Sequence, residues 1–377
     1  MDGCHGLGRR RDRRHGGCAR GAGGRGMSAE YRVDLDAFAR NLSRVRAAVA
    51  PARHMLVLKD DAYAHGQDAI VRRALEEGVT WFGAFDVATG RAVREITGPD
   101  ARIFVWLLGD AHDLAAGVAA DLDLGIGNEE LLDDLGGIAP PTPARVHLKI
   151  DTGLHRNGIR PERWDAALTR LTALVDAGAA TFEGIWSHIS EASDADDDDA
   201  RELFLAARSA AVQAGLAPRF SHLAASAAGF ARESFREDIV RVGAFSYGIR
   251  PAGGPGEGEL GIEPIGALTA AVVEVDADVV RIDVGHLHGL PSTLRGRFSA
   301  ATPAGPRTVR SIDATTSVID AWTGAAVGDE VTVFGRGGAA SATDLAELID
   351  TIGEEIALRV SSVVPRRYTA NGSRPAR

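Results

Sequence analysis

The sequence is poor in lysine and cysteine and has no long apolar run. Only two of its 42 basic residues are lysines, Lys59 and Lys149, and both cysteines lie within the first 26 of its 377 residues. The chain from Met27 onward therefore has no disulfide, cysteine nucleophile or thiolate metal site, and the cytoplasm is the expected compartment. No apolar run approaches the roughly 20 residues that span a bilayer, which excludes a membrane protein.

The balance of charge argues against nucleic acid as a partner. The formal net charge is -10, whereas non-specific nucleic-acid binding depends on neutralising phosphates. With 45% hydrophobic residues over 377 positions, the chain can bury a large core. We therefore expect a globular protein whose partner is a small molecule.

The first 26 residues differ from the rest. They contain 9 of the 45 glycines, seven arginines and two aspartates, and they lack the apolar stretch of a secretory signal. The sequence predicts that residues 1–26 are disordered, or that they result from an over-extended start, because Met27 could begin the protein.

The segment from residue 27 to 250 is predicted to fold as a (β/α)8 barrel. Short apolar runs alternate with Ala- and Leu-rich helical stretches such as 67–78 and 163–178, the pattern of βαβ units. Eight such repeats in about 220 residues fit a closed TIM-type barrel. The predicted strands are 54–59, 81–86, 102–108, 122–127, 145–151, 182–189, 219–226 and 239–248.

The remainder is predicted to form a separate domain. Residues 251–261 are a Pro- and Gly-rich linker, and short Val- and Thr-rich strands with turns then indicate an all-β domain over 262–368, followed by a polar tail at 369–377. The extended segment 31–36 could join either domain. The acidic run 194–199 lacks the glycine and closing glutamate of a calcium loop and is interpreted as a solvated loop.

The two lysines are the first candidates for chemistry. Both lie at or near the ends of predicted barrel strands, the first and the fifth, where barrel enzymes place their catalytic groups. A partly desolvated amine there can form a Schiff base with a carbonyl compound, which arginine cannot do. The alternative is that two lysines merely escaped the bias towards arginine.

The stretches around these lysines resemble those of a known family. VLKDDAYAHG (57–66) and VHLKIDTGLHRNGI (146–159) look like the two signatures of the alanine racemase family, which are fold-type III pyridoxal-phosphate enzymes. Further matches follow in order along the chain. They are GIWSHIS (184–190), SHLAASAA (221–228), RVGAFSYGIRP (241–251), VGDEVTVFG (327–335) and RVSSVVPRRY (359–368).

The resemblance implies a role for each matching residue. Lys59 would form the aldimine with pyridoxal 5'-phosphate and act as a base, and Arg241 would face the pyridine nitrogen with His188 beside it. Arg156 would bind near the substrate carboxylate, and Lys149, which some members carbamylate, would orient it. The cofactor phosphate would be bound by four further residues, Tyr63, Ser226, Gly243 and Ala244.

The β-domain half of the site departs from the family pattern. The second-base tyrosine, which the partner subunit supplies in the family, is absent, since no tyrosine lies between Tyr247 and Tyr368. His286 and His288 replace the tyrosine and aspartate of a Gly-Tyr-Ala-Asp-Gly motif, and histidine can exchange protons near neutral pH. Ala314-Thr315 replaces a Met-Asp pair of the family's carboxylate pocket if Asp320 is matched to the aspartate that follows, whereas placing Asp313 there requires a two-residue insertion. Glu354 replaces a tyrosine that reaches the phosphate, and we expect its carboxylate to turn away or the loop to be rebuilt.

These residues lead to one main hypothesis and several alternatives. The main one is a homodimeric, pyridoxal-phosphate-dependent racemase acting on alanine or a similar small amino acid, with histidine as its second acid or base. The alternatives are a catalytically weak or inactive paralogue that binds the cofactor, a fold-type III enzyme with an altered reaction such as decarboxylation, and a Schiff-base aldolase that uses Lys59 without a cofactor.

Overall fold

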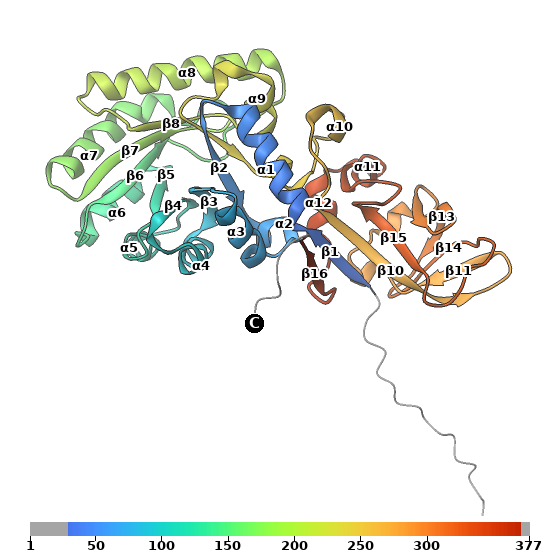
Figure 1. The fold of residues 1–377 in the computed structure, drawn as a ribbon. Helices are drawn as coiled ribbons and strands as arrows, with labels where there is room; N and C mark the ends of the chain where they lie inside the picture. The colour runs from blue at the N-terminus through green and yellow to red at the C-terminus, as the bar shows by residue number, and fades with distance from the viewer. Residues whose placement is uncertain (1–28, 371–377) are drawn as a thin grey trace, which may run out of the picture.

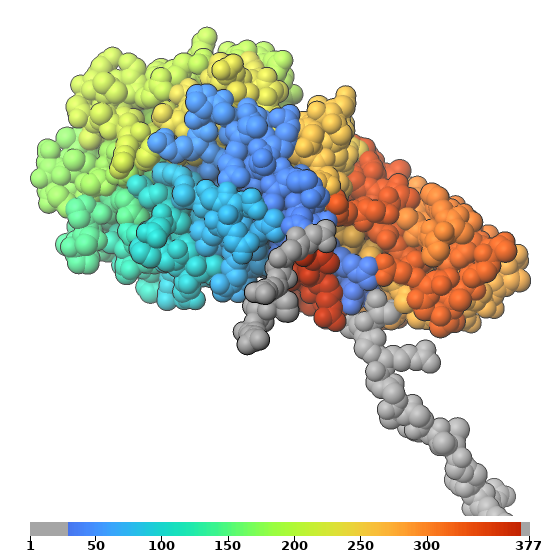
Figure 2. Space-filling model, in the orientation of Figure 1, coloured from blue at the N-terminus to red at the C-terminus, as the bar shows by residue number. Residues whose placement is uncertain are grey.

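The structure is a computed structural model that describes residues 29–370. It consists of a barrel of parallel strands and a mainly antiparallel β domain, which lie side by side (Figure 1). Helix α1 (Leu35–Val49) lies at the junction of the two lobes (Figure 2). The N-terminal segment predicted to be disordered and residues 371–377 of the predicted tail lie outside the described residues.

Eight parallel strands form the barrel, in the order β8-β7-β6-β5-β4-β3-β2-β9. All eight predicted strands are confirmed, although most end earlier than predicted because the following residues turn into the loops of the barrel mouth. Two backbone hydrogen bonds join the outermost strands, from Asp238 N to Ser221 O (3.0 Å) and from Arg241 N to Ala224 O (3.2 Å). The strands are β2 (Arg53–Leu58), β3 (Trp81–Asp86), β4 (Arg102–Leu107), β5 (Asp123–Ile126), β6 (Ala144–Lys149), β7 (Ala180–Trp186), β8 (Phe220–His222) and β9 (Ile239–Val242).

Helices surround the barrel and bury their apolar faces against it. Several begin after a side chain that accepts a hydrogen bond from the first turn, which stabilises a helix N-terminus; these caps are Asp34, Asp86, Asp110, Asn128 and Ser193. Besides α1, the barrel helices are α2 (Asp60–Ala64), α3 (Gln67–Glu76), α4 (Val87–Thr97), α5 (Ala111–Ala119), α6 (Glu129–Ile138), α7 (Trp164–Asp176), α8 (Asp194–Gln213) and α9 (Ser226–Ala231).

The acidic run 194–199 is helical, so its interpretation as a solvated loop is wrong. These residues form the first turns of α8, directly after the Ser193 cap. Aspartates are favourable there because the N-terminus of a helix carries partial positive charge.

The β domain is built on one eight-stranded sheet, in the order β11-β14-β13-β12-β15-β10-β1-β16. The segment that could have joined either domain belongs here, because β1 (Glu30–Asp34) pairs antiparallel with β10 and parallel with β16. The other strands are β10 (Gly266–Val275), β11 (Val279–Ile282), β12 (Ser299–Thr302), β13 (Gly305–Ile312), β14 (Ser317–Asp320), β15 (Glu330–Gly335) and β16 (Arg366–Thr369).

Short helices complete the fold. Helix α10 lies in the predicted linker, and α11 and α12 follow β15 and return the chain to the barrel mouth; their bounds are α10 (Glu257–Leu260), α11 (Ala342–Glu347) and α12 (Gly353–Leu358). The single 3-10 turns are η1 (Gly98–Asp100), η2 (Pro161–Arg163), η3 (Glu233–Phe235), η4 (Ala244–Tyr247), η5 (His286–His288) and η6 (Ser292–Leu294).

Two hydrophobic clusters stabilise the molecule. The larger one packs the helices against the outside of the barrel and continues into the β domain. The smaller one takes one apolar side chain from each of six barrel strands and fills the barrel interior; its members are Met55, Trp81, Phe104, Trp186, Phe220 and Ile239. Within residues 29–370, no helix is both long and apolar enough to cross a membrane.

Candidate active site

A cavity of about 540 Å³ opens where the barrel strands end. Its volume lies within the range of small-molecule sites, and in TIM barrels the loops after the strands carry the chemistry. Nine of the predicted site residues line it, namely Lys59, Tyr63, Lys149, Arg156, His188, Ser226, Arg241, Gly243 and Ala244. The barrel half of the predicted site is thus brought together in one place.

Lys59 directly follows β2 and is joined to Tyr63 by an unusual turn of backbone. All five residues from Asp60 to Ala64 have φ between +52° and +62°, so α2 is a left-handed turn made without glycine. Such a conformation costs about 1–2 kcal/mol per residue and persists only where the surroundings impose it. The turn places the Lys59 ammonium nitrogen 5.0 Å from the centre of the Tyr63 ring.

Neighbouring rings hold this strained turn in place. The Tyr63 ring lies 4.6 Å from that of Tyr247, whose hydroxyl donates to Val57 O at 2.9 Å. The Tyr31 hydroxyl in β1 lies 3.1 Å from Nε2 of His65, directly after the turn. The β domain therefore helps to fix the positions of Lys59 and Tyr63, because β1 belongs to its sheet.

Tyr63 reaches the loop after β9 because that loop has a glycine at the contact. A Cβ atom at Gly243 would lie 2.1 Å from the Tyr63 hydroxyl oxygen. No hydrogen bond joins that hydroxyl to another residue within 29–370, although Tyr63 is only 4% exposed. A polar group without a protein partner thus lies at the wall of the cavity that Ala244 and Ser226 also line.

Arg241 in β9 is held by several hydrogen bonds. Its Nη1 atom lies 3.0 Å from both Nδ1 and O of His222, and its Nη2 atom donates to Ser187 O at 2.7 Å and Leu223 O at 2.9 Å. Nδ1 of His188 lies 3.3 Å from Nη2. Burial lowers the pKa of Arg241 to about 9, which leaves the guanidinium charged at neutral pH.

Lys149, the last residue of β6, is buried in the cavity wall. Its ammonium nitrogen lies 4.5 Å from the centre of the Trp186 ring. Burial first, and then the charges of Arg241 and Arg156, lower the pKa of Lys149 to about 8. The same causes lower the pKa of His188 to about 3, so this imidazole is neutral.

Two carboxylates also line the cavity, and the sequence reasoning expected neither of them there. Glu354 of α12, which was expected to turn away from the phosphate or to lie in a rebuilt loop, lines the cavity. Glu191 follows β7 and accepts a hydrogen bond from Ala228 N (3.0 Å), and it was not singled out at all. Burial raises the pKa of both carboxyls. The charge of Glu354 raises the pKa of Glu191 further.

The remaining predicted site residues, His286, His288 and Thr315, lie on the β domain outside this cavity. His286 and Thr315 are exposed, whereas His288 is buried. Their two loops are joined by backbone hydrogen bonds, from His286 N to Asp313 O and from Leu287 N to Ala314 O, both 2.9 Å. The structure therefore brings His286 and Thr315 into one exposed surface.

Comparison with known proteins agrees with this architecture. The family model of the alanine racemase N-terminal domain matches residues 33–251, and that of the C-terminal domain matches residues 263–368. The alanine racemase of Thermobifida fusca (strain YX) is 33% identical over 369 residues, covering 90% of this chain and 98% of that relative. The alanine racemase of Beutenbergia cavernae is 33% identical over 370 residues, covering 89% and 96%.

Solved structures give the same result. Alanine racemase from Streptomyces coelicolor A3(2) superposes with a TM-score of 0.85 at 28% identity, covering 91% of this chain and 98% of that one. Alanine racemase from D-cycloserine-producing Streptomyces lavendulae gives a TM-score of 0.84 at 26% identity, with 92% and 98% covered. The chain belongs to the alanine racemase family, whose enzymes use pyridoxal 5'-phosphate as cofactor.

Proposed function

We propose that this protein is a pyridoxal-phosphate-dependent racemase that interconverts the enantiomers of alanine or of a similar small amino acid. The observation that carries the proposal is that the Lys59 amine and the Arg241 guanidinium line the same cavity at the barrel mouth. The names of the relatives supply the substrate, and the proposed location is the cytoplasm.

The residues present fit the cofactor. Tyr63 approaches the backbone at Gly243 so closely that a Cβ there would collide with its hydroxyl, and Ser226 and Ala244 line the same cavity. Ser226 and Ala244 follow the seventh and eighth barrel strands, where TIM barrels commonly bind phosphate. When bound through its aldehyde to the Lys59 amine, pyridoxal phosphate supplies an electron sink for negative charge at the substrate α-carbon.

The chain's own residues would then have distinct roles. The hydroxyls of Tyr63 and Ser226 donate to the phosphate, and the Lys59 amine takes or returns a proton at the α-carbon on one face. Arg241 faces the ring nitrogen and, because a guanidinium keeps its protons, leaves that nitrogen unprotonated, which suppresses side reactions such as transamination. Arg156 binds the substrate carboxylate, with Lys149 beside it.

Racemisation also needs an acid or base on the other face, and we propose His286 of a partner subunit in a homodimer. Nδ1 of His286 lies 3.1 Å from the carbonyl oxygen of Asp313, so Nδ1 carries the hydrogen and Nε2 has a free lone pair. Since the side chain is exposed, this lone pair is open to a partner's cavity. Thr315 lies on the same surface and would contact the substrate there.

His288 is less suited to that role. Its Nδ1 accepts a hydrogen bond from Gly285 N at 3.0 Å, so in the neutral ring Nε2 carries the hydrogen. The residue is also buried, with 7% of its surface exposed. We therefore propose His286 as the second acid or base, and His288 as the residue that shapes the loop carrying it.

A second candidate function is a cofactor-binding paralogue with little or no turnover. The two carboxylates of Glu354 and Glu191 in the cavity favour this alternative, because a negative charge there opposes binding of a phosphate dianion. The lack of a tyrosine between Tyr247 and Tyr368 supports it too.

One experiment separates the two functions. The full chain is incubated with pyridoxal phosphate, its absorbance spectrum is recorded, and alanine enantiomers are then separated by chiral chromatography. The racemase gives a visible-range band, absent in Lys59→Ala, and converts each enantiomer into the other. A band without turnover of any amino acid supports the paralogue, and no band at all contradicts both.

A further inference from the structure

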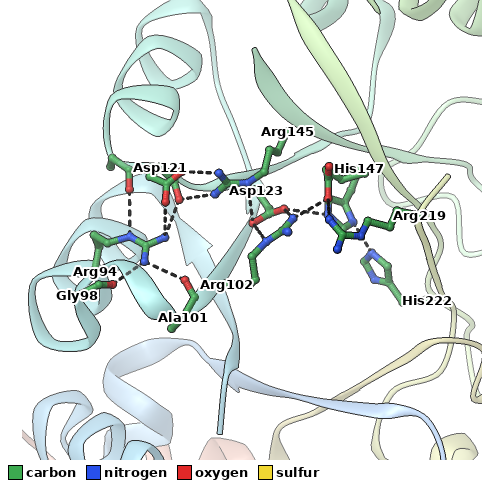
Figure 3. Close-up of polar contacts among 12 residues, drawn as sticks. Arg94, Gly98, Ala101, Arg102, Asp121, Asp123, Arg145, His147, Arg219 and His222 are labelled. Atoms are coloured by element: carbon green, nitrogen blue, oxygen red, sulfur yellow. Dashed lines mark hydrogen bonds and ion pairs between the residues drawn. The ribbon is translucent and has the colours of Figure 1, made fainter. Parts of the chain in front are cut away.

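We propose that Asp123, His147 and His222 form a hydrogen-bonded chain through the barrel interior that orients Arg241. The three would be positioning residues for the guanidinium. This inference rests on the proposed function, because that function places Arg241 against the cofactor ring. Figure 3 shows the hydrogen bonds from Asp123 through His147 to His222, together with the arginines around Asp123.

Four barrel strands supply these three residues and Arg241. Oδ1 of Asp123, the first residue of β5, lies 3.2 Å from Nε2 of His147 in β6. Nδ1 of His147 lies 2.9 Å from Nε2 of His222 in β8, and Nδ1 of His222 lies 3.0 Å from Nη1 of Arg241 in β9. An unbroken path thus runs from a carboxylate near the start of its strand to the wall of the cavity.

The chemistry of the two ends fixes where each hydrogen lies. A guanidinium can only donate, so Nδ1 of His222 accepts from Arg241 and its Nε2 must carry the hydrogen. That hydrogen is donated to Nδ1 of His147, whose Nε2 hydrogen is in turn donated to the Asp123 carboxylate. Every hydrogen bond therefore points the same way, from the guanidinium to the carboxylate, through two neutral rings.

The path is sealed from water by aromatic rings. Asp123, His147 and His222 are each 0% exposed. The Phe104 ring lies 5.1 Å from both imidazoles, and the Trp186 ring stacks on His222 with an interplanar angle of 5°. In such surroundings hydrogen bonds are strengthened, whereas an unpaired polar group is costly.

One glycine makes room for the central ring. Gly184 in β7 pairs with His147 in the sheet, and a Cβ atom there would lie 2.2 Å from Nδ1 of His147. The nitrogen that receives the hydrogen bond from His222 therefore occupies space that only a glycine leaves open.

The chain also connects Arg241 with a negative charge. Within residues 29–370, Arg241 forms no ion pair with a carboxylate, and its other acceptors are backbone carbonyls and the His188 ring. The charge of Glu191 in the same cavity opposes the lowering of the Arg241 pKa by burial. At the opposite end, Asp123 is held by Arg102, whose Nε donates to Oδ2 at 2.9 Å, and by Arg145 at 3.3 Å. Burial alone would raise the pKa of Asp123, but hydrogen bonds from His147 and Arg102 keep it well below its usual range.

The positions of the hydrogens are tested directly by NMR of the full wild-type chain. With ¹⁵N-labelled histidine, long-range ¹H–¹⁵N spectra distinguish the two tautomers, and single His→Gln variants assign the signals. We expect His147 and His222 both to carry hydrogen on Nε2 and to be neutral. A Nδ1 hydrogen on either ring, or an imidazolium, would overturn the proposal, because His222 could then not accept from Arg241.

The effect on the site is tested with three variants in the pyridoxal-phosphate-loaded protein. His147→Phe keeps an aromatic ring but breaks the chain, whereas His147→Gln can still donate to Asp123 and accept from His222. Phe104→Leu is the matched control, because Phe104 packs on both imidazoles without a hydrogen bond. The readouts are the cofactor absorbance band, kcat and KM for alanine.

We expect His147→Phe to shift the band and to lower kcat about 10-fold with KM within about 2-fold, near the lower end of what loss of an orienting partner costs in metal sites. His147→Gln and Phe104→Leu should retain the wild-type band and most of kcat. Equal losses in His147→Phe and His147→Gln, or a wild-type band and kcat in His147→Phe, would refute the chain's role. If His147→Phe does not fold, His147→Gln and the NMR result decide. A wild type without turnover refutes the proposed function instead. The NMR spectra and the absorbance band then still test whether Asp123, His147 and His222 orient Arg241.

Discussion

Replacing His286 by asparagine tests the proposed second acid or base. Asparagine can still donate to Asp313 O, as Nδ1 of His286 does at 3.1 Å, but it has no basic nitrogen. General acid–base groups contribute about 10²- to 10⁴-fold to a rate. Because His286 is exposed, water can partly replace it, and we expect a loss near the lower limit, about 10²-fold in kcat, or about 2.7 kcal/mol.

The assay follows racemisation by chiral chromatography in both directions, together with exchange of the α-proton in deuterium oxide. Exchange should persist for one enantiomer through Lys59 while conversion to the other falls. His286 is exposed, so the free energy of unfolding should change by less than about 0.5 kcal/mol, which urea titration checks. A kcat within about 3-fold of wild type in His286→Asn would refute the reasoning.

Other residues yield three further predictions. Glu354→Gln should bind pyridoxal phosphate roughly 10-fold more tightly in an absorbance titration, since it removes a negative charge from the cavity. Because burial raises the Glu354 pKa, the affinity of the wild type should fall as pH rises through that raised value. Weaker binding by the variant would contradict this. With a pKa of about 8, roughly half of the Lys149 amines are unprotonated at pH 8 and about 1% at pH 6. Incubation with ¹³C-bicarbonate should therefore give a carbamate signal in the NMR spectrum that rises with pH and is missing in Lys149→Arg. A signal of equal strength in that variant would refute the assignment. Asp123→Asn should lower the free energy of unfolding by about 3–5 kcal/mol because it leaves buried partners unpaired. The side chain of Asp121 is 57% exposed, so Asp121→Asn should cost about 1 kcal/mol or less. Equal losses in urea titrations would contradict this.

Much of the barrel could be predicted from the sequence. Each strand is a short apolar run between helical stretches, and period and composition reveal both. The two lysines could be singled out because they are the only two in the chain. They could be placed at strand ends because the apolar runs end beside them. Lys59 follows β2 directly and Lys149 ends β6, so both expectations are confirmed.

The parts that could not be predicted depend on tertiary contacts. The left-handed turn after Lys59 contains no glycine, and aspartates, of which it has two, otherwise adopt positive φ only as single residues, so no run of five could be expected; Tyr247 and β1 pack against it. The run at 194–199 was misread because its composition resembles a loop, although Ser193 before it was a usable signal for a helix start. Glu191 was missed because only the folded loop brings it beside Ala228.

The chain of Asp123, His147 and His222 was missed for a related reason. Its members lie 24 and 75 residues apart in sequence and meet only when the barrel closes. One signal was available, because a histidine within the apolar strand around Val146 and Leu148 must find a partner when buried. Sequence alone could not tell which partner.

Hydrogen–deuterium exchange at the α-carbon tests most directly whether the Lys59 amine acts on an amino acid. The full chain, loaded with pyridoxal phosphate, is incubated with L-alanine and with D-alanine in deuterium oxide, and deuterium is measured by NMR. We predict incorporation into both enantiomers, and none with Lys59→Ala. A cofactor-loaded wild type that leaves both α-protons in place would contradict the account.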